Sequence, residues 1–237
     1  MTFVAPDDPA ALARAVSTST AAVIVEPIQG EGGVRPLSQA MAQALNAACA
    51  STGALLIADE VQSGLGRTGA PFYSGVLGLK PDLMALGKAL GAGVPIGAAM
   101  LSERVAARAG FGDHGTTYGG NLLACRAALV FVDELTNGLM ANVERTGGHL
   151  EMALRQIASQ HACVRDVRGA GLMWGLELDR PAAPVVEAAL GRGLLINRTA
   201  DVVLRLLPPF VITRADVDQM VELLSAALAD VCQEGRS

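Results

Sequence analysis

Residues 21–59 read AAVIVEPIQGEGGVRPLSQAMAQALNAACASTGALLIAD, and this stretch decides the fold class. The β-branched run at residues 21–27 is typical of a strand that is buried on both faces. Apolar residues then recur at helical spacing over residues 37–50, and Ser51-Thr52-Gly53 ends the pattern. Residues 54–58 predict a second strand. A strand, a helix and a strand in this order predict a βαβ unit, and therefore an α/β fold with a mainly parallel sheet.

Further apolar patterns extend this organisation along the chain. Two more strands are predicted around the glycine-rich segment GKALGAG, at residues 82–86 and 95–101. Two helices are predicted next, at residues 121–135 and 139–159. After about residue 160 the pattern changes to short strands, at residues 164–167, 172–178, 194–197 and 202–206. We therefore predict a larger domain over residues 1–137 and a smaller α+β domain over residues 138–237.

The chain is predicted to close with an amphipathic helix. Thr213 with Asp216 resembles a capping box, which marks the start of a helix. One apolar stripe then continues at helical spacing through Val217, Met220, Val221, Leu224, Leu228 and Val231.

Composition excludes several classes of function. With 237 residues and 51% hydrophobic content, the chain can bury a substantial core, and its net charge of -5 offers no basic surface to nucleic acid. No apolar segment is long enough for a transmembrane helix, and the N-terminus lacks the features of a secretory signal. The four cysteines lie far apart without paired spacing, and the histidines are scattered, so neither a disulfide framework nor a metal site is expected. These features predict a protein of the reducing cytoplasm without membrane partners.

Two charged residues stand at the ends of predicted strands. Asp59 follows residues 54–58, and Lys88 lies in the nearly uncharged segment PDLMALGKALGAGVPIGA. A lysine amine that is removed from water becomes a usable nucleophile, although a surface lysine that extends its amine into solvent is the simpler alternative. Since open α/β sheets bind ligands at the carboxyl ends of their strands, Asp59 and Lys88 are predicted to face one ligand.

The segment GLGRTG at residues 64–69 matches the pattern G-x-G-x-x-G of dinucleotide-binding proteins. The pattern requires that its glycines open a helix whose N-terminus contacts the pyrophosphate. No helical pattern begins at this point, because the following segment APFYSGVLGLKPD is rich in proline and glycine. Nucleotide binding is therefore not favoured.

Four segments in order carry a resemblance to a known family. They are VEPIQGEGG, LIADEVQSGLGRTG, PDLMALGKALGAGVPIGA and HGTTYGGN, which begin at Val25, Leu56, Pro81 and His114. Together they resemble the class III aminotransferases, which are pyridoxal phosphate (PLP) enzymes of fold type I. The segment RLLPPFVIT, which begins at Arg205, is most similar to the acetylornithine-type members.

This resemblance implies roles around the cofactor for five residues. Lys88 would bind the cofactor covalently and move a proton, and Asp59 would pair with the pyridine nitrogen. Val61 would pack on one face of the ring and Gln62 would bind its phenolic oxygen, from alternating sides of an extended segment. Thr117 would reach the cofactor phosphate of a neighbouring subunit, which implies a homodimer with its site at the interface. A polar turn is the alternative role of Thr117.

Three further residues are interpreted in the same way. Arg205 matches the arginine that binds the α-carboxylate of glutamate or 2-oxoglutarate, for which its bidentate geometry is suited. Glu31 matches the acid that pairs with this arginine when the substrate presents an ω-amine; a purely structural ion pair is the alternative. Glu60 is expected to be a solvated or structural acid.

The resemblance runs from about residue 21 to the C-terminus and matches the C-terminal part of the family chain. Family members carry an upstream segment with a phosphate-binding loop and an aromatic that stacks on the ring, and neither is recognisable before residue 21. Leu122 also stands where the family usually has proline. Three explanations stay open: a truncated sequence, a split enzyme that a second chain completes, and a non-catalytic remnant that dimerises.

The function implied is transfer of an amino group between N-acetylornithine and 2-oxoglutarate through PLP, a step of arginine biosynthesis. The partial large domain would hold the cofactor, and the substrates would be an amino acid and a 2-oxo acid. Ornithine, succinylornithine and 4-aminobutyrate are alternative substrates, because their enzymes share most of these residues. Activity of the chain alone is left open.

Overall fold

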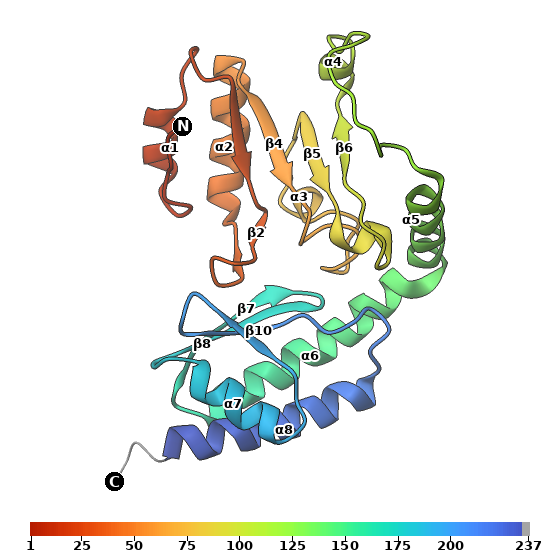
Figure 1. Cartoon of the computed structure of the whole chain (residues 1–237). Coiled ribbons are helices and arrows are strands. Elements are labelled where there is room, and N and C mark those ends of the chain that lie inside the picture. The colour runs from red at the N-terminus through yellow and green to blue at the C-terminus, as the bar shows by residue number, and fades with distance from the viewer. Residues whose placement is uncertain (234–237) are drawn as a thin grey trace. The chain divides into compact units, whose positions relative to one another are not determined.

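The computed structural model describes residues 1–233, and these divide into two compact units (Figure 1). Unit 1 comprises Met1–Ile28, Leu37–Leu65 and Ala70–Asn137. Unit 2 comprises Gln29–Pro36, Gly66–Gly69 and the chain from Gly138 onward. Two short segments from the first half of the sequence therefore belong to unit 2. A single boundary at residue 137 would assign both segments to the first domain.

Unit 1 is built on a four-stranded sheet in the order β1-β4-β5-β6 (Figure 1). The first three strands in this order run parallel, and β6 is antiparallel to β5. The prediction of an α/β fold with a mainly parallel sheet is thereby confirmed. The strands are β1 (Ala22–Val25), β4 (Leu55–Asp59), β5 (Leu83–Leu86) and β6 (Ala98–Leu101).

The predicted βαβ crossover is formed by α2 (Gln39–Thr52). The Ser38 hydroxyl accepts a hydrogen bond from Met41 N at 3.1 Å at the start of α2, and Gly53 ends the helix with a φ of 81°. Its apolar face packs into a core cluster with Leu56 of β4 and Leu12 of α1 (Pro9–Ala15). The remaining helical elements of this unit are α3 (Tyr73–Val76), the 3₁₀ turn η1 (Lys88–Gly91), α4 (Glu103–Ala106) and α5 (Leu122–Glu134).

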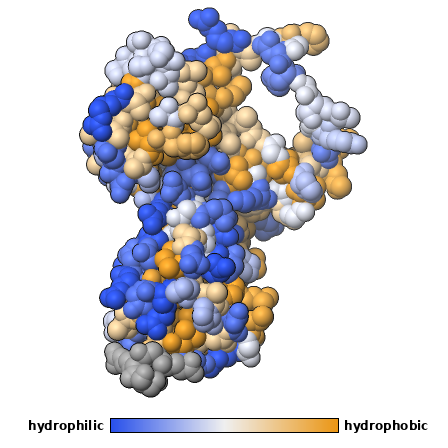
Figure 2. All heavy atoms as spheres, turned by 60° about the vertical axis from the view of Figure 1, so that its left-hand side comes forward, coloured by the Kyte–Doolittle hydropathy of each residue, from blue (hydrophilic) through white to orange (hydrophobic). Residues whose placement is uncertain are grey.

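Strand β1 is not buried on both faces, so this prediction was wrong. Val23 and Val25 pack against the core cluster of α1 and α2, whereas Ile24 on the opposite face is 59% exposed. The sequence pattern overstates burial because, among the described residues, α1 and α2 cover only one face of β1. Other large apolar side chains of unit 1 are also exposed, and Figure 2 shows apolar surface of this kind in orange. They include Met100, Leu101, Leu122, Leu123 and Leu129.

Unit 2 contains an antiparallel sheet in the order β7-β8-β10-β9. Helices α6 and α8 pack together, and residues such as Leu154, Trp174 and Leu224 form one buried core. The strands are β7 (Val164–Ala170), β8 (Met173–Leu178), β9 (Asn197–Thr199) and β10 (Val203–Leu206), and the helices are α6 (Met140–Gln160), α7 (Ala183–Gly191) and α8 (Arg214–Gln233). A π-helical turn, Leu135–Leu139, joins α5 to α6 along the chain.

The start of α8 confirms the predicted capping box. Thr213 N donates a hydrogen bond to the Asp216 carboxylate at 2.8 Å, and Asp216 N donates to the Thr213 hydroxyl at 3.3 Å. The two bonds satisfy backbone donors that have no partner inside the helix.

The segment Gln29–Pro36 is tied into unit 2 by an arginine. It contains β3 (Arg35–Pro36), which pairs with the two-residue strand β2 (Ile28–Gln29). Arg168 Nη2 donates to Gly33 O at 2.8 Å, and its Nη1 forms an ion pair with Glu177 at 2.7 Å. These contacts hold the chain next to Glu31.

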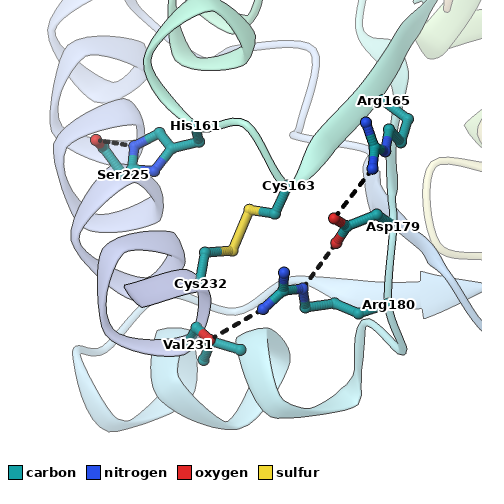
Figure 3. Close-up of a disulfide and its surroundings, with 8 residues drawn as sticks. All are labelled: His161, Cys163, Arg165, Asp179, Arg180, Ser225, Val231 and Cys232. Atoms are coloured by element: carbon teal, nitrogen blue, oxygen red, sulfur yellow. Dashed lines mark hydrogen bonds and ion pairs between the residues drawn. A yellow bond between two sulfur atoms is a disulfide. The ribbon is translucent and has the colours of Figure 1, made fainter. Parts of the chain in front are cut away.

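A disulfide joins Cys163 to Cys232, with their Cα atoms 6.2 Å apart (Figure 3). The expectation that the cysteines form no disulfide was therefore wrong. The two residues are 69 positions apart, and only the packing of the end of α8 beside the start of β7 brings them together. The absence of disulfides was one reason to predict a cytoplasmic protein, and this reason no longer holds. The cytoplasmic location stays a prediction. No helix among residues 1–233 is long and apolar enough to cross a membrane.

Candidate functional site

Asp59 and Lys88 lie at the same edge of the unit 1 sheet. Asp59 is the last residue of β4 and is paired with Ala85 of the neighbouring parallel strand β5. The following backbone amide, Glu60 N, donates to Ala85 O at 3.0 Å. Lys88 comes three residues after Ala85 and begins η1. Parallel pairing therefore brings the carboxylate and the amine to the carboxyl ends of adjacent strands, where α/β folds bind ligands.

The backbone of Lys88 has an uncommon conformation. Its φ is 46°, in the left-handed region that disfavours side chains other than glycine. At the preceding residue, Gly87, an added Cβ would make ordinary van der Waals contacts, 3.4 Å from Val61 Cγ1 and 3.6 Å from Ile96 O. Strain of this kind persists where the surroundings over-determine it, and it clusters at functional sites.

The chain after Asp59 is a turn and not an extended segment, so that prediction was wrong. Gly64 N donates to Glu60 O at 2.9 Å and closes the turn, and Val61 N donates to the Asp59 carboxylate at 3.1 Å. Gly64 permits this closure, since a Cβ there would lie 2.7 Å from Glu60 O. Inside the turn, Gln62 Oε1 is buried and has no hydrogen-bond partner among the residues that the structure describes.

A second group of predicted residues lies in unit 2. Arg205 Nη1 forms an ion pair with Glu31 Oε1 at 2.6 Å, and Arg205 Nε donates to Asn197 Oδ1 at 3.2 Å. The Arg205 side chain is 10% exposed, whereas that of Glu31 is 77% exposed. The arginine is thus fixed in the sheet, paired with Gly175 on one side and Asn197 on the other. The acid lies on the exposed side of this ion pair.

Sequence reasoning missed the surroundings of Arg205. A largely apolar groove of about 480 Å³ lies beside it, and Asn197 orients its guanidinium. Asn197 belongs to a strand that the sequence predicted at residues 194–197, but nothing in its local pattern marked it as a partner of residue 205. The groove is lined by Leu194, Leu195, Ile196, Leu206, Leu207, Pro208, Pro209, Ile212 and Met220.

Arg67 of the GLGRTG segment is a structural anchor within unit 2. Its Nη1 donates to Pro208 O at 2.5 Å, and its guanidinium stacks on Phe210 at 4.1 Å from the ring centre. Burial lowers the pKa of Arg67 to about 10. The motif therefore forms a turn with a partly buried arginine, and the next helix, α3, begins only at Tyr73.

Thr117 stands apart from these two groups. It is exposed and lies in the loop between α4 and α5. The loop ends where Asn121 caps α5, with Ala124 N donating to Asn121 Oδ1 at 2.9 Å. Among the described residues, Thr117 is placed neither with Asp59 and Lys88 nor with Arg205 and Glu31.

The family described as aminotransferase class-III matches residues 7–228. The chain belongs to this family. The resemblance found in the four sequence segments is thereby confirmed.

The curated class-III relatives include acetylornithine aminotransferases. That of Methanocaldococcus jannaschii is 40% identical over 230 residues, which are 97% of this chain and 58% of the relative. Acetylornithine aminotransferase 1 of Bordetella pertussis is 45% identical over 204 residues, which are 86% of this chain and 52% of the relative. The chain thus spans little more than half the length of these relatives.

Solved class-III structures have the same fold. N-acetylornithine aminotransferase of Stenotrophomonas maltophilia has a TM-score of 0.87 at 34% identity, covering 98% of this chain and 63% of that one. Ornithine δ-aminotransferase of Plasmodium falciparum has a TM-score of 0.89 at 33% identity, covering 98% and 62%. An ornithine aminotransferase of Toxoplasma gondii has a TM-score of 0.92 at 34% identity, covering 100% and 57%, and contains PLP at partial occupancy in its active site.

Proposed function

We propose that this chain carries the catalytic residues of a PLP-dependent aminotransferase that exchanges an amino group between N-acetylornithine and 2-oxoglutarate. The observation that carries the proposal is the position of Asp59 and Lys88 at the ends of adjacent parallel strands, in a chain of the class-III family. An acid and an amine so placed suit the two ends of one flat heterocycle.

The residues at this edge fit PLP. The Gln62 amide oxygen Oε1 is buried without a hydrogen-bond partner within residues 1–233. A 180° flip of this amide would place its NH₂ there instead, to donate to the phenolic oxygen of the cofactor. Asp59 would hold the pyridine nitrogen, Lys88 would bind the cofactor covalently, and Val61 would pack on the ring. Thr117, exposed on its loop, would reach the phosphate of a neighbouring subunit in a homodimer.

Each of these side chains has a defined chemical task. Bound PLP supplies an electron sink for the bond that breaks at the substrate carbon. The Asp59 carboxylate would hold a proton on the ring nitrogen by its negative charge. The Lys88 amine would take the proton from the reacting carbon of the substrate and later return a proton, acting as the general base and acid.

Arg205 and Glu31 would adapt the site to two unlike substrates. Arg205 would bind the α-carboxylate of glutamate in bidentate fashion. The reacting carbon of N-acetylornithine carries no carboxylate, so the largely buried arginine would be left without a partner. The Glu31 carboxylate, paired with Arg205 at 2.6 Å, would supply that partner.

The choice of N-acetylornithine rests on the curated relatives, which bear that name. Ornithine is the second candidate, because two of the compared structures are ornithine aminotransferases. Arginine biosynthesis is the pathway that the first candidate implies. The assignment of residues 1–137 as a partial cofactor domain and residues 138–237 as the small domain stays a prediction.

Covalent capture of PLP tests the proposal directly. The sequence contains two lysines, Lys80 and Lys88, and Lys80 is exposed, so it provides an internal control for non-specific attachment. Purified chain is mixed with PLP, alone and with the remaining segment of a relative, then reduced with borohydride and digested. We expect the modified peptide to contain Lys88. Absence of an adduct at Lys88 in both mixtures, or equal labelling of Lys80, would overturn the proposal.

Replacing Glu31 by glutamine is expected to separate the two half-reactions. The neutral amide cannot compensate the charge of Arg205, so kcat/KM for N-acetylornithine should fall about tenfold or more, while that for glutamate should change less than about threefold. Steady-state rates with each amino donor measure this split. Glu187→Gln, an exposed acid on α7, is the matched control and should change neither rate. Equal losses with both donors would contradict a gating role for Glu31.

A further inference from the structure

Glu60 is a charged side chain that no part of the proposed chemistry uses, and it is fully buried, with 0% exposure. Of the two roles expected for Glu60, a solvated or a structural acid, burial excludes the first, and the structural role needs a cause. Burial of a carboxylate is costly, and an apolar side chain would fill the same space at lower cost. A carboxylate buried at this position therefore requires donors that hold both of its oxygens.

Each carboxylate oxygen of Glu60 has its own donor. The Ser63 hydroxyl donates to Glu60 Oε2 at 2.6 Å, and Ser74 N donates to Glu60 Oε1 at 2.6 Å. Ser63 and Ser74 are both 1% exposed, so this is a closed polar cluster within the core of unit 1. Glu60 Oε1 thus satisfies the backbone amide of Ser74 at the start of α3, where the N-cap residue provides no side-chain hydrogen bond.

The carboxylate therefore joins two stretches of chain. Ser63 and Ser74 stand on either side of the segment Gly66–Gly69, which belongs to unit 2. Because Glu60 N is held by Ala85 O and Glu60 O by Gly64 N, every polar group of this residue is engaged. Such a residue fixes the conformation of the turn in which it stands.

Val61 and Gln62 lie inside that turn, between Glu60 and Ser63. Val61 Cγ1 lies where a side chain at Gly87, the residue before Lys88, would meet it, 3.4 Å from the Cβ position. The amide of Gln62 is the group with the unpartnered oxygen, and a 180° flip would turn its NH₂ toward a ligand instead. The orientation of both side chains thus depends on a turn that the Glu60 carboxylate closes.

We propose that Glu60 is a positioning residue, whose buried carboxylate, held by Ser63 and Ser74, fixes the turn that presents Gln62 and Val61 to bound PLP. This inference rests on the proposed function and extends it, since it assigns a role in cofactor binding to a residue that does not touch the cofactor.

The test compares Glu60→Ala, Glu60→Gln and Gln62→Ala in the full chain with added PLP. Two quantities are measured: the Kd for PLP, and the pH midpoint of the visible absorption change of the bound cofactor. A donor to the phenolic oxygen favours the deprotonated form, so Gln62→Ala should move the midpoint to higher pH, by about half a unit or more. Glu60→Ala should move it in the same direction and raise the Kd about tenfold.

Two comparisons distinguish positioning from simple stabilisation. Glu60→Gln keeps an acceptor for Ser74 N and can donate to the Ser63 hydroxyl, so it should remain within about threefold of the wild-type Kd. Leu45→Ala removes a buried side chain of α2 in the same unit, and it should lower the melting temperature without moving the pH midpoint. In the double variant Glu60→Ala/Gln62→Ala the midpoint should shift no further than in the larger single variant.

Several results would overturn the inference. They are a folded Glu60→Ala variant with wild-type Kd and midpoint, a midpoint shift in Leu45→Ala equal to that in Glu60→Ala, and additive shifts in the double variant. If Glu60→Ala fails to fold, Ser63→Ala decides the matter, because it removes one of the two donors and should still raise the midpoint. A wild-type chain that binds no PLP would overturn the proposed function as well as this inference, whereas normal wild-type binding with unchanged variants would overturn the inference alone.

Discussion

Replacing Lys88 by alanine is expected to abolish the borohydride-fixed adduct and to lower the rate of transamination by about 10⁴-fold or more. The amine would be lost both as the covalent attachment point and as the group that moves the proton. Lys88 begins η1 at the end of β5, and its φ of 46° is already adverse for a side chain, so alanine adds no new backbone strain. The melting temperature should therefore change little while the chemistry is lost.

Lys88→Arg and Lys80→Ala are the controls for this result. Arginine keeps the positive charge and the length of the side chain but does not act as an amine nucleophile, so Lys88→Arg should be as inactive as Lys88→Ala. Lys80→Ala removes the other lysine of the chain and should leave both the adduct and the rate unchanged. A Lys88→Ala variant that retains a tenth of the wild-type rate would contradict the role assigned to this residue.

The parts of the fold that could be predicted from the sequence are those set by local pattern. The helical spacing of apolar residues predicted α2, and its end at Gly53 was marked by a residue suited to a positive φ. The apolar runs on both sides predicted β1 and β4, and the right-handed crossover then required them to be parallel. The capping box before α8 is another local signal, formed by residues three positions apart.

The errors share a different cause, since each depends on contacts between distant residues. The exposed side of β1 depends on which elements cover the sheet, which the run of β-branched residues does not report. The turn after Asp59 depends on the Glu60 carboxylate and on Ser74, which is 14 residues away. An alternating pattern over four residues cannot distinguish an extended segment from a turn that a distant donor stabilises.

The candidate site shows the same division. Lys88 was conspicuous because its sequence surroundings are nearly uncharged, and Asp59 because it ends an apolar run. Arg205 and Glu31 were found only through the resemblance to the family, and the structure pairs them across 174 positions of sequence. Asn197 was missed because cross-strand pairing with Arg205 in an antiparallel sheet leaves no signal at either position.

Removing the disulfide between Cys163 and Cys232 is expected to lower the free energy of unfolding of unit 2 by about 4 kcal/mol, from the entropy of a closed loop of this length. The two cysteines are 69 residues apart, so the link excludes many unfolded conformations that an open chain would adopt. The loop includes the sheet of unit 2 and most of α8. Urea unfolding of the double variant Cys163→Ala/Cys232→Ala, followed by circular dichroism, measures the loss.

The folded state itself should persist without the disulfide. Asp179 N donates to Cys163 O at 2.9 Å. Arg180 Nη1 donates to Val231 O at 3.5 Å near the last turn of α8 (Figure 3). His161 Nε2 is hydrogen-bonded to the Ser225 hydroxyl at 2.8 Å, about two turns earlier in α8. Because these contacts hold the same junction, the variant should keep its helical signal in the absence of urea while its unfolding midpoint falls.

Reductant provides the matched measurement. It should lower the unfolding midpoint of the wild-type chain to that of the double variant, and it should leave the midpoint of the double variant unchanged. Cys125 is a free cysteine of unit 1, so the variant Cys125→Ala should respond to reductant like the wild type. Titration of thiols in the unfolded, unreduced chain should find two of the four cysteines, since Cys49 and Cys125 are free. Four titratable thiols, or a midpoint that reductant does not move, would show that α8 is held by packing and hydrogen bonds alone.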